Sequence, residues 1–241
     1  MSTFIEKENN RINYKHGTYQ KISAEIGDWT AYLEHTWKFF ERDKLNFLSW
    51  LKENPIDSKV ADDRNWKLSL EENISLRNPH KHLTSVFTNL YRISEHELGS
   101  FCHFYQLHYN IELSSEITRK IDLNKDNFYW LKALLKKQKH EMLRLDPEYQ
   151  RILQFKKIRD NLSHRPEHTL ISKPKDQTFR KFLEDADGIE LTDSYWVQEG
   201  GLHGFYFSSD VSIMNLSENI QVFFKKLLDL TYPSSRSQLI E

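Results

Sequence analysis

The sequence predicts an all-α fold, and three observations carry that prediction. Only 7 Gly and 6 Pro occur among 241 residues, so most of the chain lacks the turn-forming residues that frequent turns between short strands require. Apolar residues recur at intervals of three and four along much of the sequence, which is the spacing of one buried helix face. The 15 Phe, 11 Tyr and 6 Trp residues provide enough apolar area to close a core, even though 29% of the residues are charged.

The first elements expected are a leader and a long helix. Residues 1–18 are polar and indicate a flexible leader. Apolar residues at helical spacing then extend from Ile22 to Leu51. We therefore expect one long helix, or two in line, to end ahead of Pro55.

A second long helix is expected after a charged, irregular stretch that covers residues 55–79. Asn78 suits the N-cap of this helix, and Pro79 suits its first helical position because proline has no N–H to leave unpaired. Apolar residues then continue at helical spacing as far as Tyr105.

The remaining helices are shorter and are expected over 114–122, 126–144, 147–164, 178–185 and about 211–230. Asp146 as N-cap and Pro147 as first residue open the third of these, and Pro166 disfavours its continuation past His164. Ahead of the last helix, β-prone residues on both sides of a Gly-rich turn predict a small β-hairpin near 189–207. Residues 19–241 are thus expected to form a single helical domain.

Composition excludes several classes of protein. The single cysteine, Cys102, rules out an intrachain disulfide and a multi-cysteine zinc site. The N-terminus carries no apolar run like that of a signal peptide, and no window approaches about eighteen consecutive apolar residues. We therefore expect a cytoplasmic protein without a membrane segment. Because the net charge is −1, any contact with nucleic acid must be local.

The most informative string is Lys157-Ile158-Arg159-Asp160-Asn161-Leu162-Ser163-His164-Arg165, at the end of the helix that Pro147 opens. Its Arg159, Asp160 and His164 resemble the Arg-x4-His signature of the HEPN superfamily, in which a polar residue often follows the arginine. Members are helical domains, and many are metal-independent ribonucleases of toxin–antitoxin, abortive-infection and CRISPR systems. The resemblance implies a HEPN-like helical bundle over about 126–231, with additional N-terminal helices and the hairpin as an insertion.

The chemistry of this string fits RNA cleavage. Asp160 and His164 are four residues apart on a helix, so the carboxylate can orient the imidazole, raise its pKa and fit it for general acid–base catalysis. Arg159 offers a permanent planar charge for a phosphate. Arg159 and His164 lie about 140° apart around the helix axis, so one helix cannot close the site alone. The resemblance implies a homodimer with a composite cleft, and attack by the 2′-hydroxyl of the RNA.

Neighbouring side chains are candidates for RNA contacts, namely Lys156, Lys157, Asn161 and Arg165. Residues 132–165 contain ten Lys or Arg against four Asp or Glu, which is the local excess that phosphate contacts require. No cofactor is expected. The resemblance also implies an antitoxin or another regulatory protein as a possible partner.

Other interpretations stay open. Arg77 and His82 repeat the spacing, with Asn78 after the arginine, but a helix cap preceded by solvated charges explains them as well. A non-catalytic helical module that binds a partner protein or a nucleotide is the alternative function. A metal-dependent enzyme is disfavoured because the sequence has neither His-Glu-x-x-His nor Glu-x-x-His.

Overall fold

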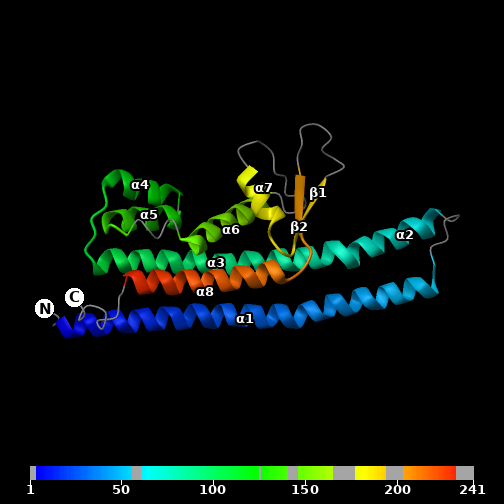
Figure 1. The fold of residues 1–241 in the computed structure, drawn as a ribbon, viewed down its shortest axis with the longest axis horizontal. Coiled ribbons are helices and arrows are strands. Elements are labelled where there is room, and N and C mark those ends of the chain that lie inside the picture. The colour runs from blue at the N-terminus through cyan, green and yellow to red at the C-terminus, as the bar shows by residue number, and fades with distance from the viewer. Residues whose placement is uncertain are drawn as a thin grey trace. The chain divides into compact units, whose positions relative to one another are not determined.

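The computed structural model describes residues 4–55, 61–124, 126–140, 146–164, 177–193 and 203–231. These residues are predominantly helical, with one two-stranded sheet (Figure 1), as the sequence predicts. The elements are α1 (Phe4–Glu53), α2 (Ala61–Glu72), the π-helical turn η1 (Asn73–Arg77), α3 (Asn78–His108), α4 (Ser115–Asn124), α5 (Asn127–Lys137), α6 (Pro147–His164), α7 (Gln177–Glu184), β1 (Ile189–Asp193), β2 (His203–Phe207) and α8 (Val211–Thr231).

The chain divides into two compact units. The first unit contains residues 1–27, 90–155 and 217–241, and the second contains residues 28–89 and 156–216. Each unit therefore combines segments that lie far apart in the sequence. Helical periodicity reports only which face of a helix is buried, so it gives no sign of such a division.

In the first unit, α1 and α3 are joined by polar and aromatic contacts. Lys21 Nζ lies 2.6 Å from Oε1 of Glu97, whose side chain is buried. Towards α8, the hydroxyl of Tyr109 donates a 2.6 Å hydrogen bond to the carbonyl oxygen of Thr231. Helices α4 and α5 lie side by side (Figure 1), and Leu131, Leu134 and Leu135 of α5 are buried. The apolar spacing predicted this buried face correctly.

The expectation of a loose leader over residues 1–18 is wrong for the part that the structure describes. Residues 4–18 belong to α1. The ring of Tyr14 stacks on Phe104 with centroids 3.5 Å apart, and Lys15 Nζ lies 2.7 Å from Oδ1 of Asp229. These partners on α3 and α8 stabilise a helix that the polar composition of the segment does not predict.

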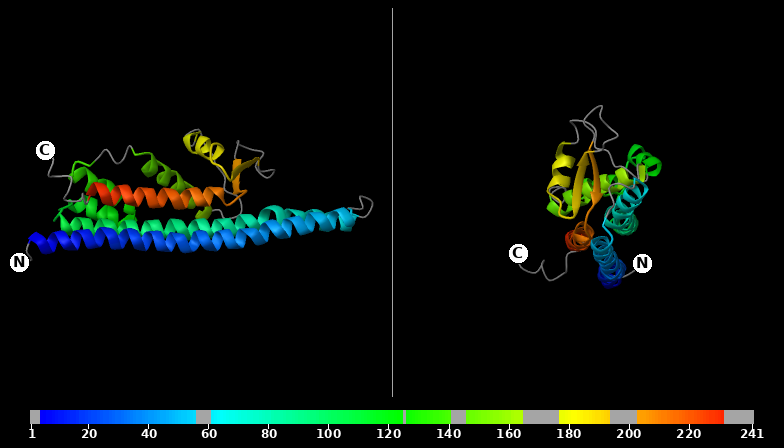
Figure 2. Two further views of the ribbon diagram at one scale, coloured as in Figure 1. Left: turned by 60° about the horizontal axis from the view of Figure 1, so that its bottom comes forward. Right: turned by 90° about the vertical axis from the view of Figure 1, so that its right-hand side faces the viewer.

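The second unit contains the small sheet. Strands β1 and β2 pair antiparallel, with Ile189 opposite Phe207 and Asp193 opposite His203. Helix α7 lies beside β1 (Figure 2), and the ring of its buried Phe179 meets the ring of Phe205 edge-on at 6.4 Å. The two predicted strands are thus confirmed within 189–207, whereas the Gly-rich turn at 194–202 lies outside the described residues.

The stretch 55–79 differs from the irregular segment that we expected. Its described part forms α2 and then η1, and Asn78 has helical φ and ψ of −70° and −47°. The N–H of Asn78 donates to the carbonyl oxygen of Asn73, so Asn78 is not an N-cap. Pro79 has no N–H to donate and its ring crowds the preceding turn. A π-helical turn directly ahead of it accommodates that disruption within a nearly continuous helix.

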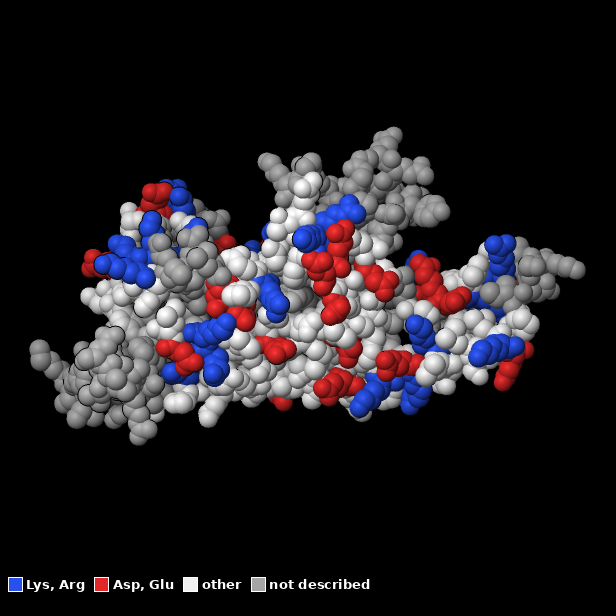
Figure 3. All heavy atoms as spheres, viewed as in Figure 1, with Lys and Arg blue, Asp and Glu red and all other residues white. Residues whose placement is uncertain are grey.

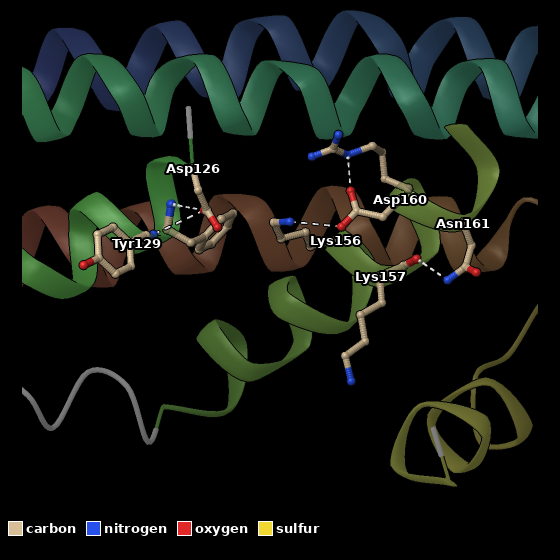
Figure 4. A network of polar contacts seen from close by, with 8 residues as sticks. Asp126, Tyr129, Lys156, Lys157, Asp160 and Asn161 are labelled. Carbon is tan, nitrogen blue, oxygen red and sulfur yellow. Dashed lines mark hydrogen bonds and ion pairs between the residues drawn. The ribbon is translucent and has the colours of Figure 1, made fainter. Parts of the chain in front are cut away.

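The sequence placed two helix starts correctly and one helix end too late. Asp146 caps α6, where the N–H of Glu148 donates to its Oδ1 at 3.0 Å. Asp126 caps α5 in the same way (Figure 4). Helix α5 ends at Lys137 rather than near 144, and Lys139 has a left-handed φ of 60°. Residues 141–144 lie outside the described part of the chain.

Gly188, directly before β1, should tolerate no side chain. Its φ is +79°, and an added Cβ would lie 2.7 Å from Oγ of Ser209 and 2.9 Å from the backbone nitrogen of Ser212. We expect Gly188→Ala to lower the free energy of unfolding by about 1–3 kcal/mol, as measured by urea denaturation. In the matched control Gly27→Ala, the added Cβ meets nothing within 4 Å inside α1, and stability should rise by about 0.5–1 kcal/mol. Equal effects of the two substitutions would contradict this prediction.

Candidate functional site

The Arg-x4-His string occupies the last turns of α6. Ile158 and Leu162 are buried, and this buried stripe fixes the directions of the polar residues between them. Arg159 is three residues before Leu162 and therefore lies at the edge of the stripe. Only 26% of its side chain is exposed. Arg159 is thus only partly exposed, because α6 stays packed as far as Leu162.

Asp160 is held between two cations of its own helix. Its Oδ2 accepts a 3.0 Å hydrogen bond from Nζ of Lys156, one turn earlier, and its Oδ1 lies 3.3 Å from Nε of Arg159 (Figure 4). The structure therefore joins three of the predicted site residues into one cluster. In this cluster Lys156 is an ion-pair partner of Asp160 rather than an isolated surface cation.

Lys157 and Asn161 lie on a different side of α6. Figure 4 shows Lys157 directed away from the Lys156–Asp160 pair. Its Nζ lies 5.7 Å from the centre of the Phe179 ring on α7, which is within reach of a cation–π interaction. Asn161 Nδ2 donates a 2.7 Å hydrogen bond to the carbonyl oxygen of Lys157. These two predicted RNA contacts are thus not part of the Asp160 cluster.

His164 is the last residue of α6, and its side chain lies outside the described residues, as does the whole of Arg165. The predicted contact between Asp160 and His164 therefore stays a prediction. So does the placement of Arg165 against RNA.

The second copy of the spacing does not form a comparable cluster. Arg77 is exposed and pairs with Glu72, with Nη2 2.9 Å from Oε1. His82 Nε2 lies 2.8 Å from Oγ1 of Thr36 on α1. Arg77 and His82 thus contact different partners. The exposure of Arg77 agrees with its interpretation as a solvated charge.

His82 lines a pocket of about 280 Å³ between α1 and α3 that the sequence analysis did not identify, together with Asp28, Trp29, Tyr32, Ser85 and Val86. Trp29 fits the apolar stripe of α1 and is easily interpreted as a core residue. Tyr32 does not fit, because it directly precedes the buried Leu33. The position of the aromatic Tyr32 outside the buried stripe was the sequence feature that could have indicated the pocket.

The predicted basic segment 132–165 is divided between the two units. Lys132, Lys136 and Lys137 belong to the first, whereas Lys156 and Lys157 belong to the second. On the face drawn in Figure 3, acidic and basic side chains of the described residues are interspersed. Phosphate contacts on that face would therefore depend on local clusters rather than on one extended basic surface.

No group of three or more His, Cys, Asp or Glu positioned to hold a metal ion occurs among the described residues. Cys102 is fully buried, and its Sγ donates to the carbonyl oxygen of Asn127 at 3.8 Å. Burial raises the pKa of this thiol, which disfavours the thiolate that a nucleophile needs.

The burial of His80 predicts that stability depends on pH. Its Nδ1 accepts a hydrogen bond from the N–H of Phe207 at 3.1 Å, and burial lowers its pKa from the ordinary value of 6.5. As the pH falls below about 6.5, His80 therefore takes up a proton in the unfolded state before it does so in the folded state. The free energy of unfolding thus falls as the pH drops. Burial lowers the pKa of His82 as well, with the same sign.

We expect the free energy of unfolding, measured by urea denaturation from pH 8 to pH 5, to fall below about pH 6.5. In His80→Gln part of this fall should be lost, whereas the contribution of His82, which has the same sign, should remain. An unchanged slope in His80→Gln would contradict the assignment.

Comparison with known proteins adds no relative: no family model, no curated protein and no solved structure matches the chain. The helices in the described part of the chain include none that is both long enough and apolar enough to span a bilayer. The fold thus defines a predominantly helical protein with a small antiparallel sheet.

Proposed function

We propose that this protein is a metal-independent endoribonuclease of the HEPN type, with a HEPN-like helical bundle and activity as a homodimer in the cytoplasm. The observation that carries the proposal is the cluster at the end of α6. There Oδ1 of Asp160 lies 3.3 Å from Nε of Arg159, and its Oδ2 lies 3.0 Å from Nζ of Lys156. His164 ends the same helix. A cation, a carboxylate and an imidazole thus occur within two helical turns.

In the proposed reaction, the 2′-hydroxyl of the RNA attacks the adjacent phosphorus. His164 takes up or delivers the proton, as an imidazole can near neutral pH. Arg159 stabilises the charge that develops on the phosphate oxygens, and its contact with Asp160 limits the orientations of the guanidinium plane. Lys157, Asn161 and Arg165 contact the flanking RNA. Because Arg159 and His164 project about 140° apart on one helix, a second copy of α6 completes the cleft.

The proposed mechanism predicts the ends of the fragments. Wild-type protein incubated with total RNA in EDTA should yield fragments with a 2′,3′-cyclic phosphate and a 5′-hydroxyl, since no water or metal ion takes part in the first step. End-specific labelling and ligation report both groups. A nuclease that activates water with a metal ion would be silent in EDTA, and that result would contradict the proposal.

The HEPN resemblance also motivates a role in defence or in a toxin–antitoxin system, with an antitoxin or another regulatory protein as partner. Expression of an unregulated ribonuclease depletes cellular RNA. Growth should therefore stop on induction of the wild type and continue on induction of His164→Ala at equal protein level.

A second candidate is a non-catalytic helical module that binds a partner protein. It is favoured by large apolar side chains exposed on α1 and α2 in the second unit, namely Phe39, Leu45, Leu48, Trp66 and Leu68. Exposed apolar groups of this size are typical of protein interfaces when they gather in one patch. A stable complex that forms without any RNA cleavage would favour this candidate.

A further inference from the structure

The pocket between α1 and α3 in the second unit is large enough to hold a small group. Its volume is about 280 Å³, close to the lower limit of about 300 Å³ for ligand pockets. Val86, which is buried, lines part of it, and the hydroxyl of Ser85 adds a polar group. All the lining residues belong to one unit.

Two aromatic rings form perpendicular walls of this pocket. The Trp29 and Tyr32 rings lie 5.7 Å apart with an angle of 87° between their planes. Tyr32 remains 48% exposed, so a ligand can reach the pair from solvent. In this edge-to-face contact the edge of one ring meets the face of the other. The face of an aromatic ring carries negative potential, so a ring face that lines the pocket attracts a cation.

The polar groups of the pocket favour the same kind of ligand. Asp28 is exposed and lines the pocket beside the two rings, so its carboxylate attracts cations and repels anions. Burial lowers the pKa of His82, which favours the neutral form of the imidazole. Its Nε2 is 2.8 Å from Oγ1 of Thr36, a contact that fixes the ring. Among the described residues that line the pocket, no Lys or Arg competes with a cationic ligand.

We propose that this pocket binds an organic cation, an alkylated ammonium group, against the Trp29 and Tyr32 ring pair and beside Asp28. A trimethylammonium group presents methyl groups to the ring faces and Val86, and its charge is balanced by the carboxylate. Such a group occurs in free small molecules and on methylated lysine side chains. The site is independent of the proposed ribonuclease centre, because it uses none of its residues.

The test is titration of the intact protein with choline, followed through the Trp29 indole N–H resonance. Its neutral isostere, 3,3-dimethylbutan-1-ol, serves as the matched ligand control. We expect saturable binding of choline and at least about tenfold weaker binding of the alcohol, since the alcohol has the same shape but no charge. Equal binding of the two, or no saturation by choline, would overturn the proposal.

Variants locate the site. Asp28→Asn and Tyr32→Leu alter exposed side chains, and each should weaken choline binding by about 2- to 30-fold. Trp66→Leu, which removes an exposed tryptophan on α2 outside the pocket, should bind choline like the wild type. Loss of binding in Trp66→Leu with none in Tyr32→Leu would place the cation elsewhere and overturn the assignment.

Two further ligands test where the cation comes from and whether the pocket binds an aromatic base instead. N-acetyl-trimethyllysine amide that binds more tightly than choline would support a modified protein as the source of the cation, and the reverse order would support a free small molecule. Adenosine monophosphate carries an aromatic base and negative charge. If it shifts the Trp29 resonance and choline does not, the pocket is a base-stacking site and the proposal is wrong.

Discussion

His164→Ala should reduce the rate of RNA cleavage in EDTA by about 100- to 10,000-fold, the range expected when a general acid or base is lost. We expect the thermal midpoint to change little, because the substitution falls at the end of a helix and removes no residue from its interior. His164 is the last residue of α6, so its replacement breaks no helix interior. Cleavage of labelled RNA and a thermal melt of the same sample measure the two effects.

His96→Ala is the matched control for this variant. The His96 side chain is 72% exposed on α3, so the control makes the same chemical change at a helix surface outside the α6 cluster. It should cleave RNA at the wild-type rate. If His164→Ala also cleaves at that rate, the Arg-x4-His spacing is accidental. If it unfolds, His164 is structural and the non-catalytic interpretation gains.

Arg159→Ala should lose activity to a comparable extent through the loss of a charged phosphate contact. Its effect on stability should exceed that of His164→Ala, because Arg159 is largely buried and lies beside Asp160. The loss should stay modest, since Asp160 is still paired with Lys156 and remains in contact with water. The sequence alone predicts no such difference between the two variants.

Much of the helical framework was predictable because each helix carries its own signal. The buried stripe that begins at Ile22 and the Asp146 cap are encoded within a few neighbouring residues. The helical leader was not predictable, since its stability depends on Phe104 and Asp229, roughly a hundred and two hundred residues away. A polar segment gives no sign of such distant partners.

The sequence predicted which residues of α6 belong to the candidate site, but not which of them pairs with Asp160. Asp160 has a possible partner at i+4, His164, and another at i−4, Lys156, and both spacings are equally compatible with a helix. The structure places Lys156 on the carboxylate. The pocket at His82 required the contact between α1 and α3, because its aromatic walls lie more than forty residues from His82 in the sequence.

The second large effect is expected from Phe87→Ala in the core of the second unit. Phe87 is fully buried on α3, and its ring centre lies 5.2 Å from that of Phe207 on β2. Truncation of a buried phenylalanine costs about 3–5 kcal/mol, because it removes apolar contacts and leaves a cavity. A typical domain is stable by about 5–15 kcal/mol, so the urea midpoint should fall steeply.

The location of this cavity predicts which part of the fold loosens first. His80 lies on the same helix as Phe87 and accepts the N–H of Phe207, so the two α3 residues together hold β2. Hydrogen exchange at the Phe205 and Phe207 amides should therefore accelerate in Phe87→Ala beyond the global change. In the control Phe39→Ala, the lost side chain is 43% exposed, and the cost should stay below about 1 kcal/mol because little buried area is removed. Equal costs for the two substitutions would mean that Phe87 does not anchor β2 to α3.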